Sequence, residues 1–198
     1  DLFKGNDPVM ITVDKILPAS TAYFISIAAE DLQLLNSQFV RYLATVHSAD
    51  PRKKKISALD QKYKVKIEET LLSVLDQEIT MAIATFEKGS QRQSSPLVLL
   101  RCKSGDLADR KLKSVFEQIQ VKNGRSTDQL KSSYRIDADT RFDIFEIPVE
   151  DLTGLLFGKL FSVPGRSYYT VLGNYIVIGS SKEALGDLLY NNVLSKTL

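Results

Sequence analysis

One strand-to-helix junction occurs twice in this sequence of 198 residues. Residues 27–35 read IAAEDLQLL and residues 147–155 read IPVEDLTGL, so five of the nine aligned positions are identical. In each copy an apolar run precedes the Glu-Asp pair, and an apolar pattern with helical spacing follows it. The feature predicts a duplicated fold unit, with chance similarity between apolar strands as the alternative.

Apolar periodicity gives both halves of the chain the same predicted order of strand, helix, strand, strand and helix. The closing strands also align, because Val98-Leu99-Leu100 matches Ile176-Val177-Ile178 at an offset of 78 residues. We therefore expect an α+β fold made of two unequal strand-helix-strand-strand-helix repeats. Its sheets should be mostly antiparallel, with helices packed on one face.

The predicted organisation has four parts, which are an N-terminal arm, a first repeat, a linker and a second repeat, at residues 1–20, 21–121, 122–133 and 134–198. The first repeat is longer because it contains a predicted helix at about 57–76 and a polar segment, Glu87 to Ser95. We expect this segment to be an exposed hairpin loop. In the second repeat, Ser180 and Glu183 predict a capping box that opens the last helix.

Bulk composition restricts the classes of partner. The chain has 26 basic and 24 acidic residues, so its net charge of +2 argues against a nucleic-acid partner recruited by long-range charge. No apolar stretch approaches the roughly 18 residues that a transmembrane helix needs. The sequence begins at Asp1 instead of methionine, which suggests an upstream segment that carries targeting information. Low cysteine content fits both the cytosol and a bacterial envelope.

Residues for catalysis, cofactors and metals are scarce. His47 and Cys102 are the one histidine and the one cysteine, which leaves too few ligands for a usual zinc site. His47 is expected to cap a helix end or to be exposed, and no GxSxG motif supports a Ser-His-Asp triad. Cys102 ends an apolar run and is expected to be a buried, inert thiol. No glycine-rich phosphate loop is present, so we assign no catalytic residue, cofactor or metal ligand.

Two groups of carboxylates are candidate sites. The Glu-Asp pairs at 30–31 and 150–151 resemble a general acid and base contributed by symmetric halves, but helix capping explains their position more simply. Asp137, Asp139 and Asp143 would offer oxygen ligands for calcium or magnesium. We expect them instead to serve the tight turn between two strands.

A basic segment is the one candidate binding site that the sequence offers. It runs from position 52 to position 66 and contains a single acid, Asp60. Positive charge at a helix start opposes the helix dipole, so stability does not explain the arrangement. An anionic partner, such as phospholipid head groups or nucleic acid, is the functional interpretation, and a solvated linker and helix face is the alternative. The candidate residues are Arg52, Lys53, Lys54, Lys55, Lys62 and Lys66.

Two segments, 17–27 (LPASTAYFISI) and 175–185 (YIVIGSSKEAL), resemble a family of uncharacterised Bacteroidetes envelope proteins. In that family an opening of proline, small polar residues and an apolar strand recurs, as does an apolar strand followed by serine and a Glu-Ala-Leu helix. The resemblance implies a secreted or membrane-anchored fragment of a longer protein, located in the cell envelope or periplasm. A cytoplasmic location is the alternative.

Taken together, these observations predict a non-enzymatic, envelope-associated binding or scaffolding domain whose partner is an unknown protein or envelope component. The alternative is a small-molecule or lipid-binding module, or an unrecognised enzyme, whose site is a groove between the two repeats. An enclosed apolar pocket with converging polar groups would favour a small ligand. A flat apolar patch would favour a protein partner.

Overall fold

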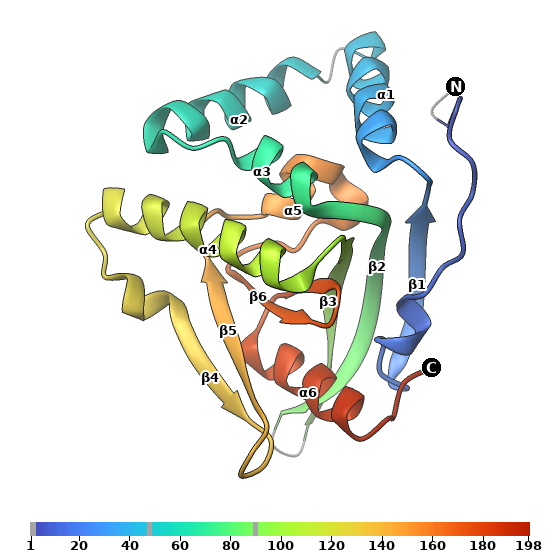
Figure 1. Ribbon diagram of the computed structural model, residues 1–198, viewed down its shortest axis with the longest axis vertical. Helices are drawn as coiled ribbons and strands as arrows, with labels where there is room; N and C mark the ends of the chain where they lie inside the picture. The colour runs from blue at the N-terminus through green and yellow to red at the C-terminus, as the bar shows by residue number, and fades with distance from the viewer. Residues whose placement is uncertain (1–2, 47–48, 89–90) are drawn as a thin grey trace.

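A computed structural model describes residues 3–46, 49–88 and 91–198. In these ranges the chain forms one seven-stranded sheet in which every neighbouring pair is antiparallel, with the order β1-β2-β3-β7-β6-β5-β4 (Figure 1). The predicted α+β class is therefore confirmed. The strands are β1 (Thr21–Ala28), β2 (Leu75–Lys88), β3 (Gln91–Cys102), β4 (Lys131–Arg135), β5 (Arg141–Ile147), β6 (Ser167–Leu172) and β7 (Tyr175–Gly179).

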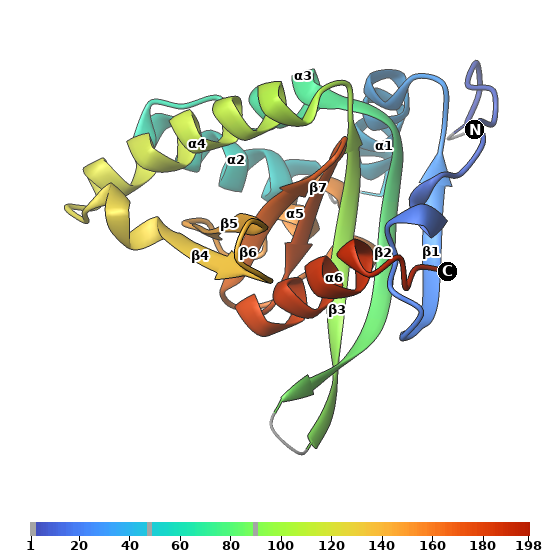
Figure 2. The same ribbon diagram turned by 60° about the horizontal axis from the view of Figure 1, so that its bottom comes forward.

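Helices lie over both faces of this sheet, and not over one face as predicted, because α6 packs on the face opposite α1 to α5 (Figure 2). The larger core lies between α1 to α5 and the face that carries Val98, Leu100 and Ile176. The smaller core lies on the opposite face, where α6 and the N-terminal arm pack on Leu99 and Val177. The helices are α1 (Leu32–Thr45), α2 (Ala49–Tyr63), α3 (Ile67–Val74), α4 (Gly105–Lys122), α5 (Leu152–Phe157) and α6 (Lys182–Val193), with 3-10 turns η1 (Val13–Lys15), η2 (Thr127–Leu130) and η3 (Lys159–Phe161).

The two halves meet where β3 pairs with β7. Leu99 lies opposite Val177, its counterpart at the offset of 78 residues. On either side of this pair, Val98 faces Ile178 and Leu100 faces Ile176, so the register is symmetric about the seam. The strands β1 and β5 are each third from the seam. A duplicated unit predicts this symmetry, although the boundaries of the two repeats stay a prediction.

The last helices of the two halves depart from that symmetry, because α4 lies over one face of the sheet and α6 over the other. Ser104, which caps α4, follows Leu99 by five positions, whereas Ser181, which caps α6, follows Val177 by four. Successive residues of a strand point to opposite faces. A connection that is one residue shorter therefore directs α6 to the other face.

The predicted helix at about 57–76 is two helices, α2 and α3, and this prediction was wrong in its bounds. Lys64 ends α2 in the left-handed conformation with φ 54°. The Asp60 carboxylate then accepts a hydrogen bond from the Ile67 N–H at 3.0 Å, which caps the start of α3. The hydrogen bond from Ile67 to Asp60 therefore connects the two helices across the break. Tyr63 and Val65, which lie at the break, are buried in the larger core.

Three further predictions differ from the structure. The segment expected to be a hairpin loop is largely strand, since β2 extends to Lys88 and β3 starts at Gln91. These two strands form a ribbon that projects beyond the core, and a polar sequence suits such a ribbon (Figure 2). The helix α6 is capped by the Ser181 hydroxyl, while Ser180 contacts Ser95. The predicted linker 122–133 contains the end of α4, η2 and the start of β4. His47 lies outside the described residues.

Candidate functional site

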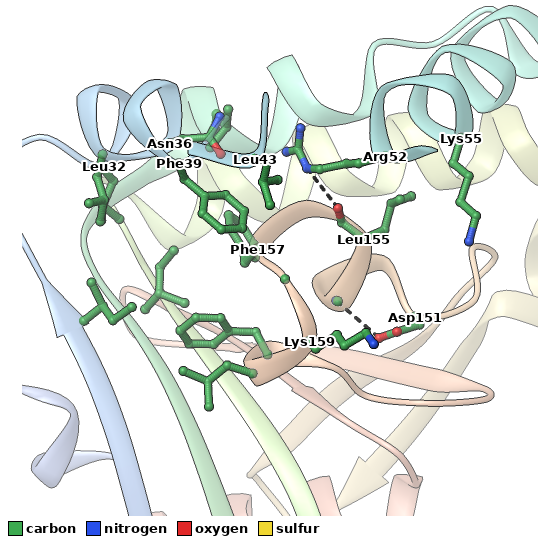
Figure 3. Close-up of a pocket in the computed structure, with 18 of the residues that line it drawn as sticks. Leu32, Asn36, Phe39, Leu43, Arg52, Lys55, Asp151, Leu155, Phe157 and Lys159 are labelled. Carbon is green, nitrogen blue, oxygen red and sulfur yellow. Dashed lines mark hydrogen bonds between the residues drawn. The ribbon is translucent and has the colours of Figure 1, made fainter. Parts of the chain in front are cut away.

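An apolar groove of about 740 Å³ lies on the larger core, between α1 and α2 on one side and α5 and η3 on the other (Figure 3). Its walls therefore come from both halves of the chain. Its volume falls in the roughly 300–1,000 Å³ range that is typical of small-molecule sites. The main apolar residues of its walls are Leu32, Leu35, Phe39, Leu43, Leu155 and Phe157.

The helix α1 supplies one wall through a single stripe of its surface. Leu32 and Leu35 are buried against the core, whereas Phe39 and Leu43 continue the stripe at helical spacing and stay partly exposed. The apolar stripe of α1 extends beyond the core on which the helix packs, so part of the stripe is left uncovered. That uncovered part faces the groove in Figure 3.

The second Glu-Asp junction builds the opposite wall. Asp151 is the N-cap of α5 and adopts a left-handed conformation with φ 45°, which aspartate tolerates better than most residues. Its carboxylate accepts hydrogen bonds from Gly154 N–H at 3.2 Å, Val163 N–H at 3.0 Å and the Ser162 hydroxyl at 2.8 Å. One carboxylate thus holds both the start of α5 and the chain that follows η3.

Arg52 connects α2 to this wall. Its guanidinium donates hydrogen bonds to the backbone carbonyls of Leu155 at 3.1 Å and Leu156 at 2.9 Å, and it pairs with the Glu68 carboxylate of α3. The Arg52 side chain is only 12% exposed. Carbonyls at the end of a helix lack partners within the helix, so a planar guanidinium suits this position. Arg52 is therefore engaged inside the protein.

The remaining charged side chains of the groove are Lys55, Lys159 and Glu150, and all three are exposed. Within the described ranges none of them forms a side-chain hydrogen bond or an ion pair. Arg52 and Asp151, by contrast, are occupied by the contacts above. The groups available to a ligand are thus two ammonium groups and one carboxylate at the edge of an apolar groove.

The other basic residues of the predicted site have separate environments. Lys66 pairs with Glu69 at 2.7 Å, and the Lys62 ammonium lies 4.7 Å from the centre of the Tyr63 ring. Lys53 and Lys54 are exposed on α2. Because Arg52 turns inward, the structure does not present all six candidates to one anionic surface, and binding of such a surface by the others stays a prediction.

Asp31, Asp137 and Asp151 serve the backbone, as the capping and turn interpretations predicted for them, whereas Asp143 lies within β5 and pairs with Lys131 at 2.8 Å. Asp31 Oδ1 accepts hydrogen bonds from the N–H groups of Gln33 and Leu34 at 2.8 and 2.9 Å, so it caps α1 as Asp151 caps α5. Asp137 accepts from the N–H groups of Asp139 and Thr140, and these hydrogen bonds lower the Asp137 pKa. Among the described side chains, no group of three His, Cys, Asp or Glu residues is placed to hold a metal ion.

Cys102 is buried, as predicted, and its thiol donates to the Asn174 carbonyl at 3.1 Å. Burial, with a smaller contribution from Asp76, raises the Cys102 pKa to about 11, so the reactive thiolate is rare at neutral pH.

Sequence reasoning did not predict that Arg52 binds inside the protein or that Lys159 lines the groove. The signal for Arg52 was an arginine at the start of a run of lysines, since arginine is the cation that suits buried, planar contacts. No sequence pattern around Lys159 indicates that it lines a groove, because only the fold brings η3 opposite α2.

In the described part of the chain, no helix combines the length and apolarity needed to cross a membrane. Comparison with family models, with curated proteins and with solved structures found no match for this chain. The resemblance to envelope proteins, and the location that it implies, therefore stay predictions from the sequence.

Proposed function

We propose that this chain is a binding module that takes an elongated amphipathic small molecule into the groove between its two halves. The observation that carries the proposal is the groove itself, about 740 Å³ of mostly apolar walls with charged groups at its edge. Apolar walls with a few oriented polar groups are the usual construction of a ligand site. The arrangement suits a ligand whose tail is apolar and whose head is polar.

A series of 1-alkanols of increasing length tests this proposal, with displacement of a neutral apolar dye as the measurement. Burial of each methylene is worth about 0.8 kcal/mol, so each added methylene should tighten binding about fourfold until the groove is full. Affinity that does not change with chain length would contradict the proposal.

Two neighbouring positions of α1 give a matched pair of variants. Leu43 lines the groove and Tyr42 is exposed beside it, at 55%. Leu43→Asn places an amide in the apolar wall and should weaken alkanol binding by about tenfold. Tyr42→Asn should leave binding unchanged. Equal effects of the two substitutions would show that the alkanols bind elsewhere, and thermal unfolding of both variants checks that each one folds.

The scaffolding role predicted from the sequence has one specific observation in its favour, the edge strand β1. Tyr23, Phe24 and Ile25 of this strand are 57%, 37% and 44% exposed. Edge strands usually carry charges that prevent pairing with another chain, and residues 20–29 have none. We propose as a second candidate that β1 pairs with β1 of a second copy. Sedimentation should then show a dimer that Ile25→Lys abolishes; a monomer at high concentration would exclude this role.

A further inference from the structure

The charges around the groove point to the class of head group that it takes, and this inference rests on the proposed function. Of the five charged residues on its walls, Arg52 is paired with Glu68, and the Asp151 carboxylate accepts three hydrogen bonds. These two groups have no remaining role in ligand binding. The selectivity of the groove must therefore come from Lys55, Lys159 and Glu150.

The two lysines are unevenly placed along the groove. Figure 3 shows Lys55 on α2 and Lys159 on η3 towards the end where Asp151 lies, while Leu32 and Phe39 line the other end. The two lysines come from different halves of the chain and from opposite walls. The groove thus has an apolar end and a charged end, which fixes the orientation of an amphipathic ligand.

We propose that the groove selects ligands with a single negative charge at the head, such as a long-chain carboxylate, held between Lys55 and Lys159. The two ammonium groups and the Glu150 carboxylate together carry one net positive charge. One negative charge on the ligand balances that excess, whereas a cationic head group would add to it. Each ammonium offers three N–H donors, and a carboxylate accepts several hydrogen bonds in return.

The test compares three ligands with the same twelve-carbon chain, namely dodecanoate, dodecanol and dodecyltrimethylammonium, below their micelle concentrations and at pH 8. Exposed ion pairs are individually weak, so dodecanoate should bind about five- to tenfold more tightly than dodecanol. The cation should bind most weakly. Raising the salt concentration from 50 to 500 mM should reduce the preference for dodecanoate and leave dodecanol binding unchanged.

Variants of the two lysines assign the preference to this end of the groove. The double substitution Lys55→Gln and Lys159→Gln should make dodecanoate and dodecanol bind equally, while Lys54→Gln, on the same helix but outside the groove, should keep the difference. Glu150→Gln should strengthen dodecanoate binding about twofold. All four residues are exposed, so these changes should not alter folding.

The outcomes separate this inference from the proposed function. If dodecanol binds as tightly as dodecanoate, the groove binds apolar chains but the head-group inference is wrong. A preference for the ammonium compound, or one that survives in the double lysine variant, would also overturn it. If none of the three compounds binds, the proposed function itself fails.

Discussion

The two Glu-Asp junctions share a sequence pattern but are stabilised in different ways. Asp31 has the extended conformation usual for an N-cap, and its carboxylate accepts hydrogen bonds from Gln33 and Leu34 in the first turn of α1. Asp151 is left-handed, and its carboxylate reaches past the first turn of α5 to the chain after η3. The residue at the third position after each aspartate accounts for part of the difference. It is Leu34 in the first junction and Gly154 in the second.

Helix length explains why the second junction needs the additional contacts. The helix α1 has 14 residues and can rely on its own hydrogen bonds, whereas α5 has six and cannot. At Gly154 an added Cβ would collide with the Asp151 carboxylate. The glycine therefore gives the carboxylate room to connect the short helix to its surroundings. A repeated sequence motif thus fixes where a helix begins, but not what holds it in place.

The largest expected effect is on the free energy of unfolding, when each capping carboxylate is removed in turn. Asp151→Ala leaves two backbone N–H groups and a hydroxyl without their partner, so we expect it to lower the free energy of unfolding by about 3 kcal/mol. Asp31→Ala removes an exposed cap and should cost about 1 kcal/mol. Urea unfolding of both variants measures the difference. Equal losses would mean that the two junctions are stabilised alike.

The short helix α5 is also held at its other end, because Arg52 from the first half of the chain binds its last carbonyls. We expect Arg52→Ala to lower the free energy of unfolding by about 2 kcal/mol, since two carbonyls and the Glu68 carboxylate lose a charged donor. It should also weaken alkanol binding by loosening one wall of the groove. Lys53→Ala, on the exposed side of α2, should change stability by less than about 0.5 kcal/mol. If Arg52→Ala leaves the free energy of unfolding unchanged, α2 is held by its apolar contacts and not by Arg52.

Gly154→Ala tests the role of the glycine through the sign of its effect. Alanine normally stabilises a helix over glycine by about 0.5–1 kcal/mol. Here we expect it to lower the free energy of unfolding by about 1–2 kcal/mol, because the new methyl group displaces the Asp151 carboxylate. In the Asp151→Ala background the same substitution should be neutral or stabilising. Additive effects of the two substitutions would contradict the proposed collision.

At the offset of 78 residues, Cys102 in the closing unit of the first half aligns with Ser180 in that of the second. Burial raises the Cys102 pKa from 9.0 to about 11, so the folded protein keeps this proton at a pH where the unfolded chain has lost it. Stability is then complete below about pH 9 and falls as the pH rises to about 11. We expect a loss of about 1 kcal/mol at pH 10 that Cys102→Ser abolishes. The difference between the unfolding curves of the two proteins at pH 8 and pH 10 measures it.

Prediction from the sequence succeeded where neighbouring residues decide the outcome. The closing strands β3 and β7 contain Val98–Leu100 and Ile176–Ile178, as predicted, and α1 begins after the predicted acidic pair. It failed where a distant partner decides. The break at Lys64 depends on Asp60 and on burial of Tyr63, and the paired residues of the β2–β3 ribbon have a polar sequence typical of loops. The charged groups of the groove were not predictable, because they come from segments far apart in the sequence.

The sequence by itself determined the antiparallel α+β class, the two capped junctions and the matching strands at the seam, because apolar periodicity and capping act over a few residues. Only the tertiary structure decided that α6 lies opposite α4, that Arg52 turns inward and that Lys55 and Lys159 lie at one end of a groove. The physical reason is that these features depend on contacts between segments up to about a hundred residues apart, such as that between Arg52 and Leu155. No local pattern encodes such contacts.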